Sequence, residues 1–182
     1  MEDITLIKDS VAILESISMN RGMIWEKISE FQSQIKSIEG AINHTAGTPQ
    51  SEEMQSTLPL KQKLENGLYT REIFMPKGQL VISFIHKQNH PSFFLSGEMS
   101  VLNDKGEVKR IKAPMAIETE AGTQRVAVMH EDCVWVCVYR TDAKTFEEAE
   151  LEIYTDNYKE LPLELIKIEK NKEICQEQYQ QQ

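Results

Sequence analysis

The feature that most constrains the fold is a series of short apolar segments between residues 58 and 141, separated by turn-forming residues. The segments are rich in Val, Ile, Phe and Tyr, which favour strands, whereas the Gly, Pro, Asn and Asp between them favour tight turns. Strands at intervals of about 8–12 residues predict an antiparallel sandwich or barrel, whose closure removes exposed sheet edges. We expect strands at residues 58–65, 67–75, 79–86, 92–102 (with a bend or bulge at Gly97), 107–113, 115–120, 123–129 and 133–139.

The last predicted strand is apolar on both faces. One face carries Val134, Val136 and Val138, and the other carries Cys133, Trp135, Cys137 and Tyr139. Such a strand fits a barrel interior on one side and a covering helix or subunit on the other. Cys133 and Cys137 would lie about 13 Å apart along the strand, too far for a disulfide. We therefore interpret them as core residues and expect a reducing, intracellular setting.

A helical pattern precedes the strands. Its first apolar stripe consists of Ile4, Ile7, Val11 and Leu14; after a break at residues 20–22, a second consists of Ile24, Ile28, Phe31, Ile35, Ile38 and Ile42. The alternating spacing of three and four in the second stripe is that of a coiled-coil heptad. Two arrangements satisfy it: the helices fold back on each other or on the sheet domain, or residues 23–43 assemble with copies of themselves.

Composition divides the chain into four parts. Residues 1–44 form a helical arm that ends at His44, which we interpret as an exposed helix-end residue. Residues 45–57 are a polar linker, 58–141 the barrel, and 142–182 a helix with a charged tail. Asp142 is the expected N-cap of a helix over 143–154, whose acidic residues we interpret as a solvated face. A short docked strand or helix is expected around residues 161–168.

The charge balance excludes some partners. The chain has 20 Lys and Arg against 29 Asp and Glu, a net charge of −9, and lacks a basic run with interleaved aromatic residues. We therefore expect no nucleic-acid partner. No apolar run reaches the roughly 20 residues of a membrane-spanning helix, and the N-terminus lacks the layout of a secretion signal. We expect no membrane partner and a cytoplasmic location.

The segment HKQNHPSFFLSGEMSVLNDKG, followed by APMAIETEAGTQRVAV, resembles the cupin superfamily. More narrowly, GLYTREIFMPKGQLVISFIHKQNHPSFFLSGEMSVL and VMHEDCVWVCVYRTD resemble small cupin-domain proteins of bacteriophages and prophages. The resemblance covers residues 60–145. It implies a mainly β fold, an antiparallel barrel of the jelly-roll type, with the helical arm and the C-terminal helix outside it. It also implies a place in the cytoplasm of a bacterial host or on a virion.

The resemblance extends to the family's metal-binding motifs. The first motif has two histidines separated by one residue, then a glutamate, then a glycine seven residues later. Aligned on Gly97, the motif places Phe84 and His86 at the two histidines and His90 at the glutamate. The resemblance therefore implies that one ligand is kept, at His86, one is exchanged for another ligand type, at His90, and one is lost, at Phe84.

The second motif has Pro-x-Gly and a histidine three residues after the glycine. Gly122 matches its glycine, and Arg125 then stands at the histidine position. A guanidinium repels a cation and suits a carboxylate, a phosphate or a sugar hydroxyl instead. An ordinary salt bridge of Arg125 with Glu98 or Glu120 remains an open alternative.

Strand alternation places further residues near the predicted pocket. One face of the strand over 79–86 carries Leu80, Ile82, Phe84 and His86. These residues predict an apolar wall that ends in an imidazole at the barrel mouth. Tyr69 and Arg71 share a face of the second strand, where they either add polar contacts to the pocket or lie on a solvated surface.

These observations lead to two functional hypotheses. The preferred one is a non-catalytic binding or assembly protein without a cofactor, which takes a small polar or anionic molecule or a protein partner in the barrel and forms a homo-oligomer through its N-terminal helices. The alternative is a metal-dependent enzyme, dioxygenase-like or isomerase-like, with a divalent transition metal on His86 and His90. His130 is the candidate third ligand, although strand parity places it on the face opposite to Arg125.

Overall fold

The computed structural model describes residues 2–19, 24–102 and 106–162. Its elements are α1 (Glu2–Met19), α2 (Ile24–Ile35), α3 (Glu52–Thr57), β1 (Leu60–Glu65), β2 (Leu68–Met75), β3 (Leu80–Ile82), β4 (Ile85–His86), β5 (His90–Ser96), β6 (Glu98–Leu102), β7 (Val108–Lys112), β8 (Met115–Thr119), β9 (Val126–Met129), β10 (Cys133–Arg140), α4 (Phe146–Ile153), β11 (Tyr154–Thr155) and the 3₁₀ helix η1 (Tyr158–Glu160). The side chains of Ile4 and Ile7, and the predicted docked element beyond residue 162, lie outside the described part.

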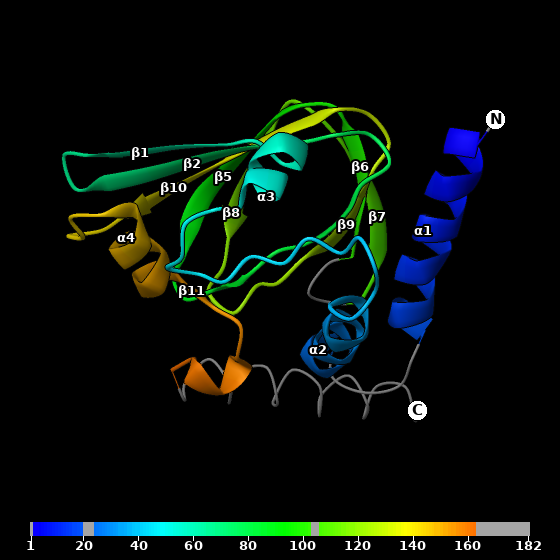
Figure 1. Ribbon diagram of the computed structural model, residues 1–182, viewed down its shortest axis with the longest axis horizontal. Coiled ribbons are helices and arrows are strands. Elements are labelled where there is room, and N and C mark those ends of the chain that lie inside the picture. Colours follow the sequence, from blue (N-terminus) through cyan, green and yellow to red (C-terminus); the bar gives the residue numbers. More distant parts are fainter. Residues whose placement is uncertain (1, 20–23, 103–105, 163–182) are drawn as a thin grey trace, which may run out of the picture.

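The strands form two main sheets that face each other, as Figure 1 shows. One sheet has the order β1-β2-β10-β5-β8 and the other β3-β9-β6-β7, while β4 pairs with β11. Every pairing is antiparallel. The prediction of a mainly β, cupin-like antiparallel barrel is confirmed. Its core includes the fully buried residues Tyr69, Phe94, Met129, Cys133 and Tyr139.

The predicted strand 92–102 is divided at Gly97 into β5 and β6, which belong to different sheets. Gly97 has a φ of +92°, and a Cβ atom there would lie 2.4 Å from the carbonyl oxygen of Asp132. Because only glycine tolerates both conditions, the residue lets the chain turn the corner from one sheet to the other. The bend predicted at Gly97 is confirmed.

The predicted strand 79–86 is interrupted at Ser83, and this corrects the predicted alternation. Leu80 and Ile82 pack outward against the cluster that includes α1 and α2. Ser83 then forms an irregular set of hydrogen bonds with the chain just before β9. After this break, Phe84 and His86 line the barrel interior. The four residues therefore do not share one face, because a single break in a strand exchanges its faces.

Helices α1 and α2 cover the outer face of the four-stranded sheet (Figure 1). The buried residues of this contact are Leu14, Ile17, Ile28, Leu102, Val126 and Val128. The apolar seam is thus buried within the chain, as in the docking arrangement, and assembly with copies stays a prediction. Helix α2 ends at Ile35, so the last two residues of the predicted seam, Ile38 and Ile42, lie beyond the helix, and Ile38 is 60% exposed.

Residues 40–58, called the strap below, follow α2, cross the barrel and include α3 (Figure 1). The part expected to be a linker contains α3, whose N-cap Ser51 accepts a hydrogen bond from the backbone of Met54 at 3.1 Å. Helix α4 is capped by Thr145, which accepts from the backbone of Glu148 at 3.1 Å, so the prediction of Asp142 as N-cap is wrong. No helix in the described ranges is both long and apolar enough to span a membrane.

Candidate functional site

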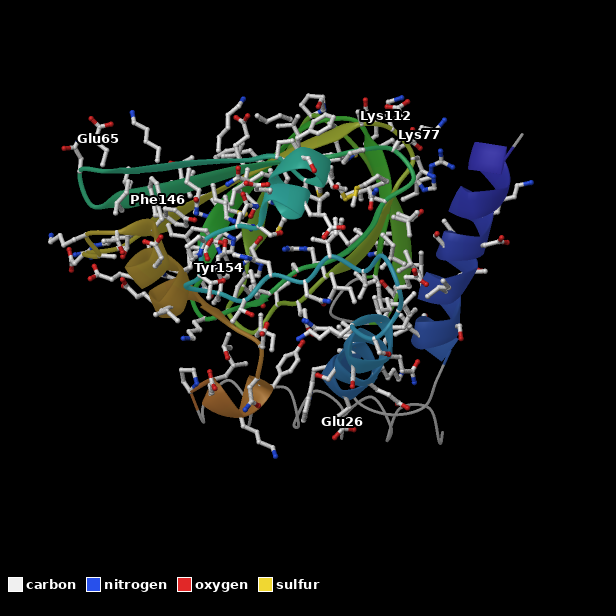
Figure 2. All side chains as sticks on the ribbon, viewed as in Figure 1. Glu26, Glu65, Lys77, Lys112, Phe146 and Tyr154 are labelled. Atoms are coloured by element: carbon white, nitrogen blue, oxygen red, sulfur yellow. The ribbon has the colours of Figure 1, made fainter. Side chains whose placement is uncertain are left out.

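A cavity of about 480 Å³ lies inside the barrel, between the two sheets and the strap. Among the residues singled out from the sequence, it brings together Arg71, Phe84, His86 and Arg125. Tyr154 of β11 also lines it, and Figure 2 shows this residue at the α4 end of the barrel, away from Lys77 and Lys112 at the opposite end. The cavity is called the barrel cavity below.

Arg71 projects from β2, opposite Cys137 of β10. The central carbon of its guanidinium lies 5.6 Å from the centre of the Tyr154 ring. Its buried Nε has no hydrogen-bond partner among the described residues. Burial opposes the charge of Arg71, but the nearby phenols of Tyr154 and Tyr69 and the carboxylate of Glu150 outweigh this effect and keep its pKa above the ordinary value. Arg71 is therefore a permanent cation with unused hydrogen-bonding capacity.

Arg125 reaches the barrel cavity from the chain just before β9. One of its terminal nitrogens, Nη2, donates to the hydroxyl of Thr119 at 3.0 Å, and its guanidinium carbon lies 5.6 Å from the centre of the Trp135 ring. Glu98, one of the two predicted salt-bridge partners of Arg125, forms its ion pairs with Arg110 and Lys112. The guanidinium of Arg125 thus lies over an aromatic ring, a common arrangement for arginine.

His86 is buried and belongs to a short chain of hydrogen bonds. Its Nδ1 lies 2.9 Å from the hydroxyl of Tyr139, which accepts a hydrogen bond from the hydroxyl of Tyr154 at 3.0 Å. Burial, and then the charges of His90 and the two arginines of the cavity, hold the pKa of His86 well below its usual range. The neutral imidazole can accept the Tyr139 proton at Nδ1, and this tautomer leaves Nε2–H as a donor.

His90 lies beside His86, with ring centres 4.6 Å apart. Its Nδ1 lies 3.1 Å from the carbonyl oxygen of Gln88, and its buried Nε2 has no hydrogen-bond partner in the described part of the chain. Burial lowers the pKa of His90 to about 4. His130, the candidate third metal ligand, lies elsewhere, with its Nε2 2.7 Å from the hydroxyl of Ser100.

The residues at the family's metal-ligand positions do not fit a metal ion. Phe84 offers no donor atom, and Arg125 brings a positive charge to the same cavity. Within residues 2–19, 24–102 and 106–162, no three His, Cys, Asp or Glu side chains are grouped as a metal site requires. His86 and His90 alone are fewer ligands than the three that catalytic zinc and iron sites typically use.

A second polar group surrounds Glu150 of α4. The Glu150 side chain is 3% exposed and that of His44 is 6% exposed, with His44 Nε2 3.3 Å from one carboxylate oxygen. The same oxygen accepts a hydrogen bond from the backbone of Gly47 at 3.1 Å. The other oxygen accepts from Gln62 Nε2 at 3.2 Å and from the Tyr69 hydroxyl at 3.5 Å. We call these five residues the Glu150 cluster.

The Glu150 cluster corrects three predictions. His44 is a buried partner rather than an exposed helix-end residue, and α4 does not present all of its acidic residues to solvent. Tyr69 belongs to this cluster and does not line the barrel cavity, unlike Arg71 on the same strand. Burial raises the pKa of Glu150, but the hydrogen bond from His44, the charge of Arg71 and the Gly47 amide outweigh it, so the pKa lies below its ordinary value.

Sequence reasoning overlooked Glu150, although the sequence contains a signal for it. Phe146, Ala149, Glu150 and Ile153 follow the spacing i, i+3, i+4, i+7, so Glu150 stands within the apolar stripe of its helix. A carboxylate at a core-facing position has to be paired, because burial of an unpaired charge is costly. Trp135 and Tyr154 line the cavity and were not predicted as parts of a ligand site, because aromatic residues in strands usually indicate only a core.

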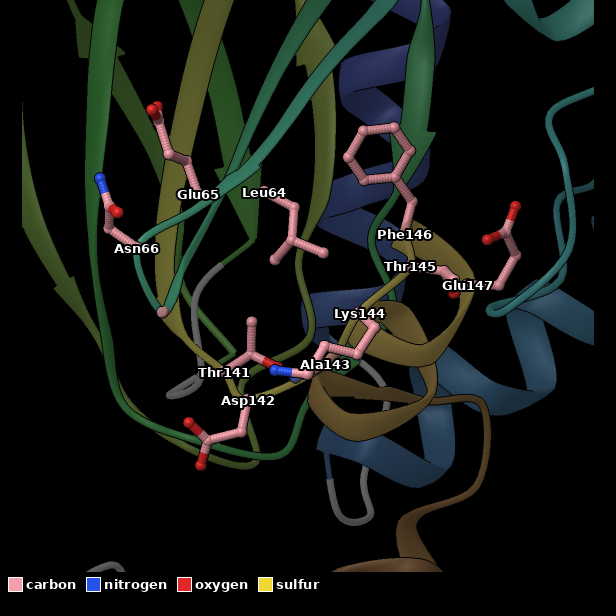
Figure 3. Close-up of a pocket in the computed structure, with 11 residues that line it drawn as sticks. Leu64, Glu65, Asn66, Thr141, Asp142, Ala143, Lys144, Thr145, Phe146 and Glu147 are labelled. Atoms are coloured by element: carbon pink, nitrogen blue, oxygen red, sulfur yellow. The ribbon is translucent and has the colours of Figure 1, made fainter.

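A second hollow, of about 590 Å³, lies between the β1–β2 turn and the start of α4 (Figure 3). Its carboxylates, Glu65, Asp142 and Glu147, point away from one another rather than converge. Glu65 is paired with Lys63 at the surface. Among the described residues that line it, no buried polar atom lacks a partner, whereas the barrel cavity contains Nε of Arg71, so we regard the barrel cavity as the candidate site.

Comparison with known proteins finds no matching family model and no similar curated protein. Among solved structures, the chain is similar to ectoine synthase from P. lautus (14% identity, 66% of this chain and 81% of that one, TM-score 0.44). It is also similar to KdgF from Halomonas sp. (15% identity, 49% and 83%, TM-score 0.41). A third is the Cupin_2 domain of an XRE family transcriptional regulator from Enterobacter cloacae (13% identity, 48% and 99%, TM-score 0.40).

These similarities are too weak to carry an argument about activity. The names describe those three proteins and assign no activity to this chain. The resemblance to phage and prophage proteins is not tested by them and stays a prediction. What the strand order and the antiparallel pairings establish is a cupin-like barrel.

Proposed function

We propose that this protein binds a small carboxylate-bearing molecule in the barrel cavity, with Arg71 as the main anchor and Arg125 and His86 as further donors. The observation that carries the proposal is the buried Nε of Arg71, which lacks a hydrogen-bond partner in the described residues. Buried polar groups are nearly always paired in folded proteins. A carboxylate would supply the missing acceptor, because the guanidinium fork matches carboxylate geometry.

The surroundings of Arg71 support an anionic ligand. Two guanidinium groups line the barrel cavity, while Glu150, the nearby buried carboxylate, already accepts hydrogen bonds from the members of its own cluster. The tautomer of His86 favoured by Tyr139 would add an uncharged donor. These groups recognise an anion but provide no nucleophile and no paired acid and base, so the proposal assigns binding and no catalytic residue.

The strap favours a small molecule over a protein partner. Ile42, Asn43 and His44 line the barrel cavity from the strap, and Met54 of α3 is buried against it. The strap is held by the contacts of His44 and Gly47 with Glu150. A folded partner could not reach Arg71 past these residues, whereas a ligand of a few heavy atoms fits the cavity volume.

The test is calorimetric titration of the purified protein with butanoate and with butanamide, which have the same shape but differ in charge. We expect the carboxylate to bind at least tenfold more tightly, because a hydrogen bond to a charged group contributes about 1.5–3 kcal/mol. Arg71→Met should abolish this preference. Arg140→Met, which replaces an exposed arginine of β10, is the matched control and should preserve it. Equal binding of the two compounds by the wild-type protein would refute the proposal.

A further inference from the structure

The inner wall of the barrel changes from polar to apolar along the barrel axis. The register of β2 against β10 pairs Arg71 with Cys137, then Ile73 with Trp135, then Met75 with Cys133. Because alternate residues of a strand face the same side, these three pairs form successive layers of the interior. The charged and tyrosine-rich end therefore passes, over about 13 Å of strand, into an apolar end.

Methionines dominate the apolar end. The buried side chains that line this part of the barrel cavity are those of Met54, Met75, Met99, Val101, Ala127 and Met129. Met99 lies opposite Met129, and Val101 opposite Ala127, in the pairing of β6 with β9. Gln79, in the turn before β3, is a polar residue of the same lining. Methionine is flexible and polarisable, so a wall of this composition adapts to apolar groups of different shape.

We propose that the ligand is an amphipathic monocarboxylate, whose head group binds at Arg71 and whose unbranched aliphatic chain extends into the methionine-lined end. This inference rests on the proposed function, because the head group needs the Arg71 site. A short polar carboxylate would leave the apolar end unused, and a charged group at the far end of the ligand would be buried among the methionines. Met75, Met99 and Met129 belong to the hydrophobic core and also line the barrel cavity, so an apolar chain that enters this end would contact them.

The experiment uses matched pairs of straight-chain acids and amides, from butanoate and butanamide to octanoate and octanamide, titrated into the full-length protein. Each added methylene should tighten binding by about fourfold, as expected for burial of one CH₂ group. Ala127→Leu adds bulk to the wall of the apolar end and should remove the gain for the longest acids. Ala116→Leu, the same exchange at an exposed position of β8, should leave the series unchanged.

The two proposals fail in different ways. If acids are preferred over amides but affinity does not rise with chain length, the inference about the chain is wrong and the carboxylate site stands. If acids and amides bind equally at every length, the Arg71 site is wrong and the chain inference falls with it. If affinity rises with the length of the acid to the same extent in the wild type and in Ala127→Leu, the aliphatic chain of the ligand binds elsewhere and the inference is overturned. The wild-type series does not depend on how well either variant folds.

Discussion

Two groups of polar side chains are neighbours at the α4 end of the barrel, and they differ in how their hydrogen-bonding capacity is met. In the Glu150 cluster, both oxygens of the buried carboxylate accept hydrogen bonds, from side chains and from one backbone amide. By contrast, Nε of Arg71, which lines the barrel cavity, and Nε2 of His90, which lies beside His86, are buried without a partner among the described residues. A fully satisfied group is what a fold needs to be stable, whereas an unsatisfied one indicates a place for a ligand.

The largest expected effect on stability comes from removing Glu150, the carboxylate at the centre of the Glu150 cluster. Glu150→Ala should lower the free energy of unfolding by about 3 kcal/mol, because it leaves several buried donors without an acceptor. Urea denaturation followed by circular dichroism measures this. Glu147→Ala, at an exposed position in the first turn of the same helix, is the control and should cost well under 1 kcal/mol. Equal losses in the two variants would show that the Glu150 cluster does not hold the strap and α4 to the barrel.

Acid should affect the two groups in different pH ranges. The folded-state pKa values of His86 and His90 lie below the ordinary value, that of His90 at about 4. Their contribution to stability is therefore complete above the unfolded pKa of about 6.5 and is lost as the pH falls below it. Between pH 7.5 and 5.5 we expect a loss of about 1 kcal/mol for each histidine.

The pKa of Glu150 is also lowered, but from an acidic starting value, so its contribution persists until the pH falls below about 4.5. Thermal melts at intervals of half a pH unit separate the two ranges. The double variant His86→Phe/His90→Phe should flatten the curve between pH 7.5 and 5.5, and Glu150→Gln should change only the range below 4.5. If the double variant keeps the wild-type slope, the two histidines are not buried as neutral groups.

Tyr69→Phe tests whether Tyr69 belongs to the Glu150 cluster or to the ligand site in the barrel cavity. The Tyr69 hydroxyl accepts from Gln62 at 2.5 Å and lies 3.5 Å from Glu150, and burial raises its pKa to about 12. Loss of this hydroxyl should cost about 1 kcal/mol of stability. Because Tyr69 does not line the barrel cavity, butanoate should bind the variant as it binds the wild type. A loss of binding without a loss of stability would move Tyr69 from the Glu150 cluster to the ligand site.

The sequence predicted the barrel better than it predicted the polar groups. Strand positions follow from alternation and turn residues, which act locally, and the corner at Gly97 could be recognised for the same reason. His44 and Glu150 lie far apart in the chain and meet only because the strap crosses the barrel. Their pairing depends on long-range packing, which local patterns do not record.

The convergence of Phe84, His86 and Arg125 was found by aligning the chain on Gly97 and Gly122 rather than by strand parity. Parity alone assumed an unbroken strand from residue 79 to 86 and misplaced Leu80 and Ile82. The reason is physical: one irregular residue, Ser83, exchanges the two faces of a strand, and its hydrogen bonds with the chain before β9 have no signature in the sequence. Sites that depend on such a break require the structure.

The smallest expected effect on stability is that of Arg71→Met. It decides whether Arg71 is an anchor for a ligand or a structural partner of the Glu150 cluster. Arg71→Met should change the free energy of unfolding by no more than about 1 kcal/mol, because it removes a cation that is costly to bury and keeps an apolar side chain of similar length. Glu150 would lose the nearby charge of Arg71 but keep its hydrogen bonds with His44, Gly47 and Gln62. If Arg71→Met instead destabilises the protein as much as Glu150→Ala does, Arg71 serves the Glu150 cluster, and its unsatisfied Nε is a cost of the fold rather than a site for a carboxylate.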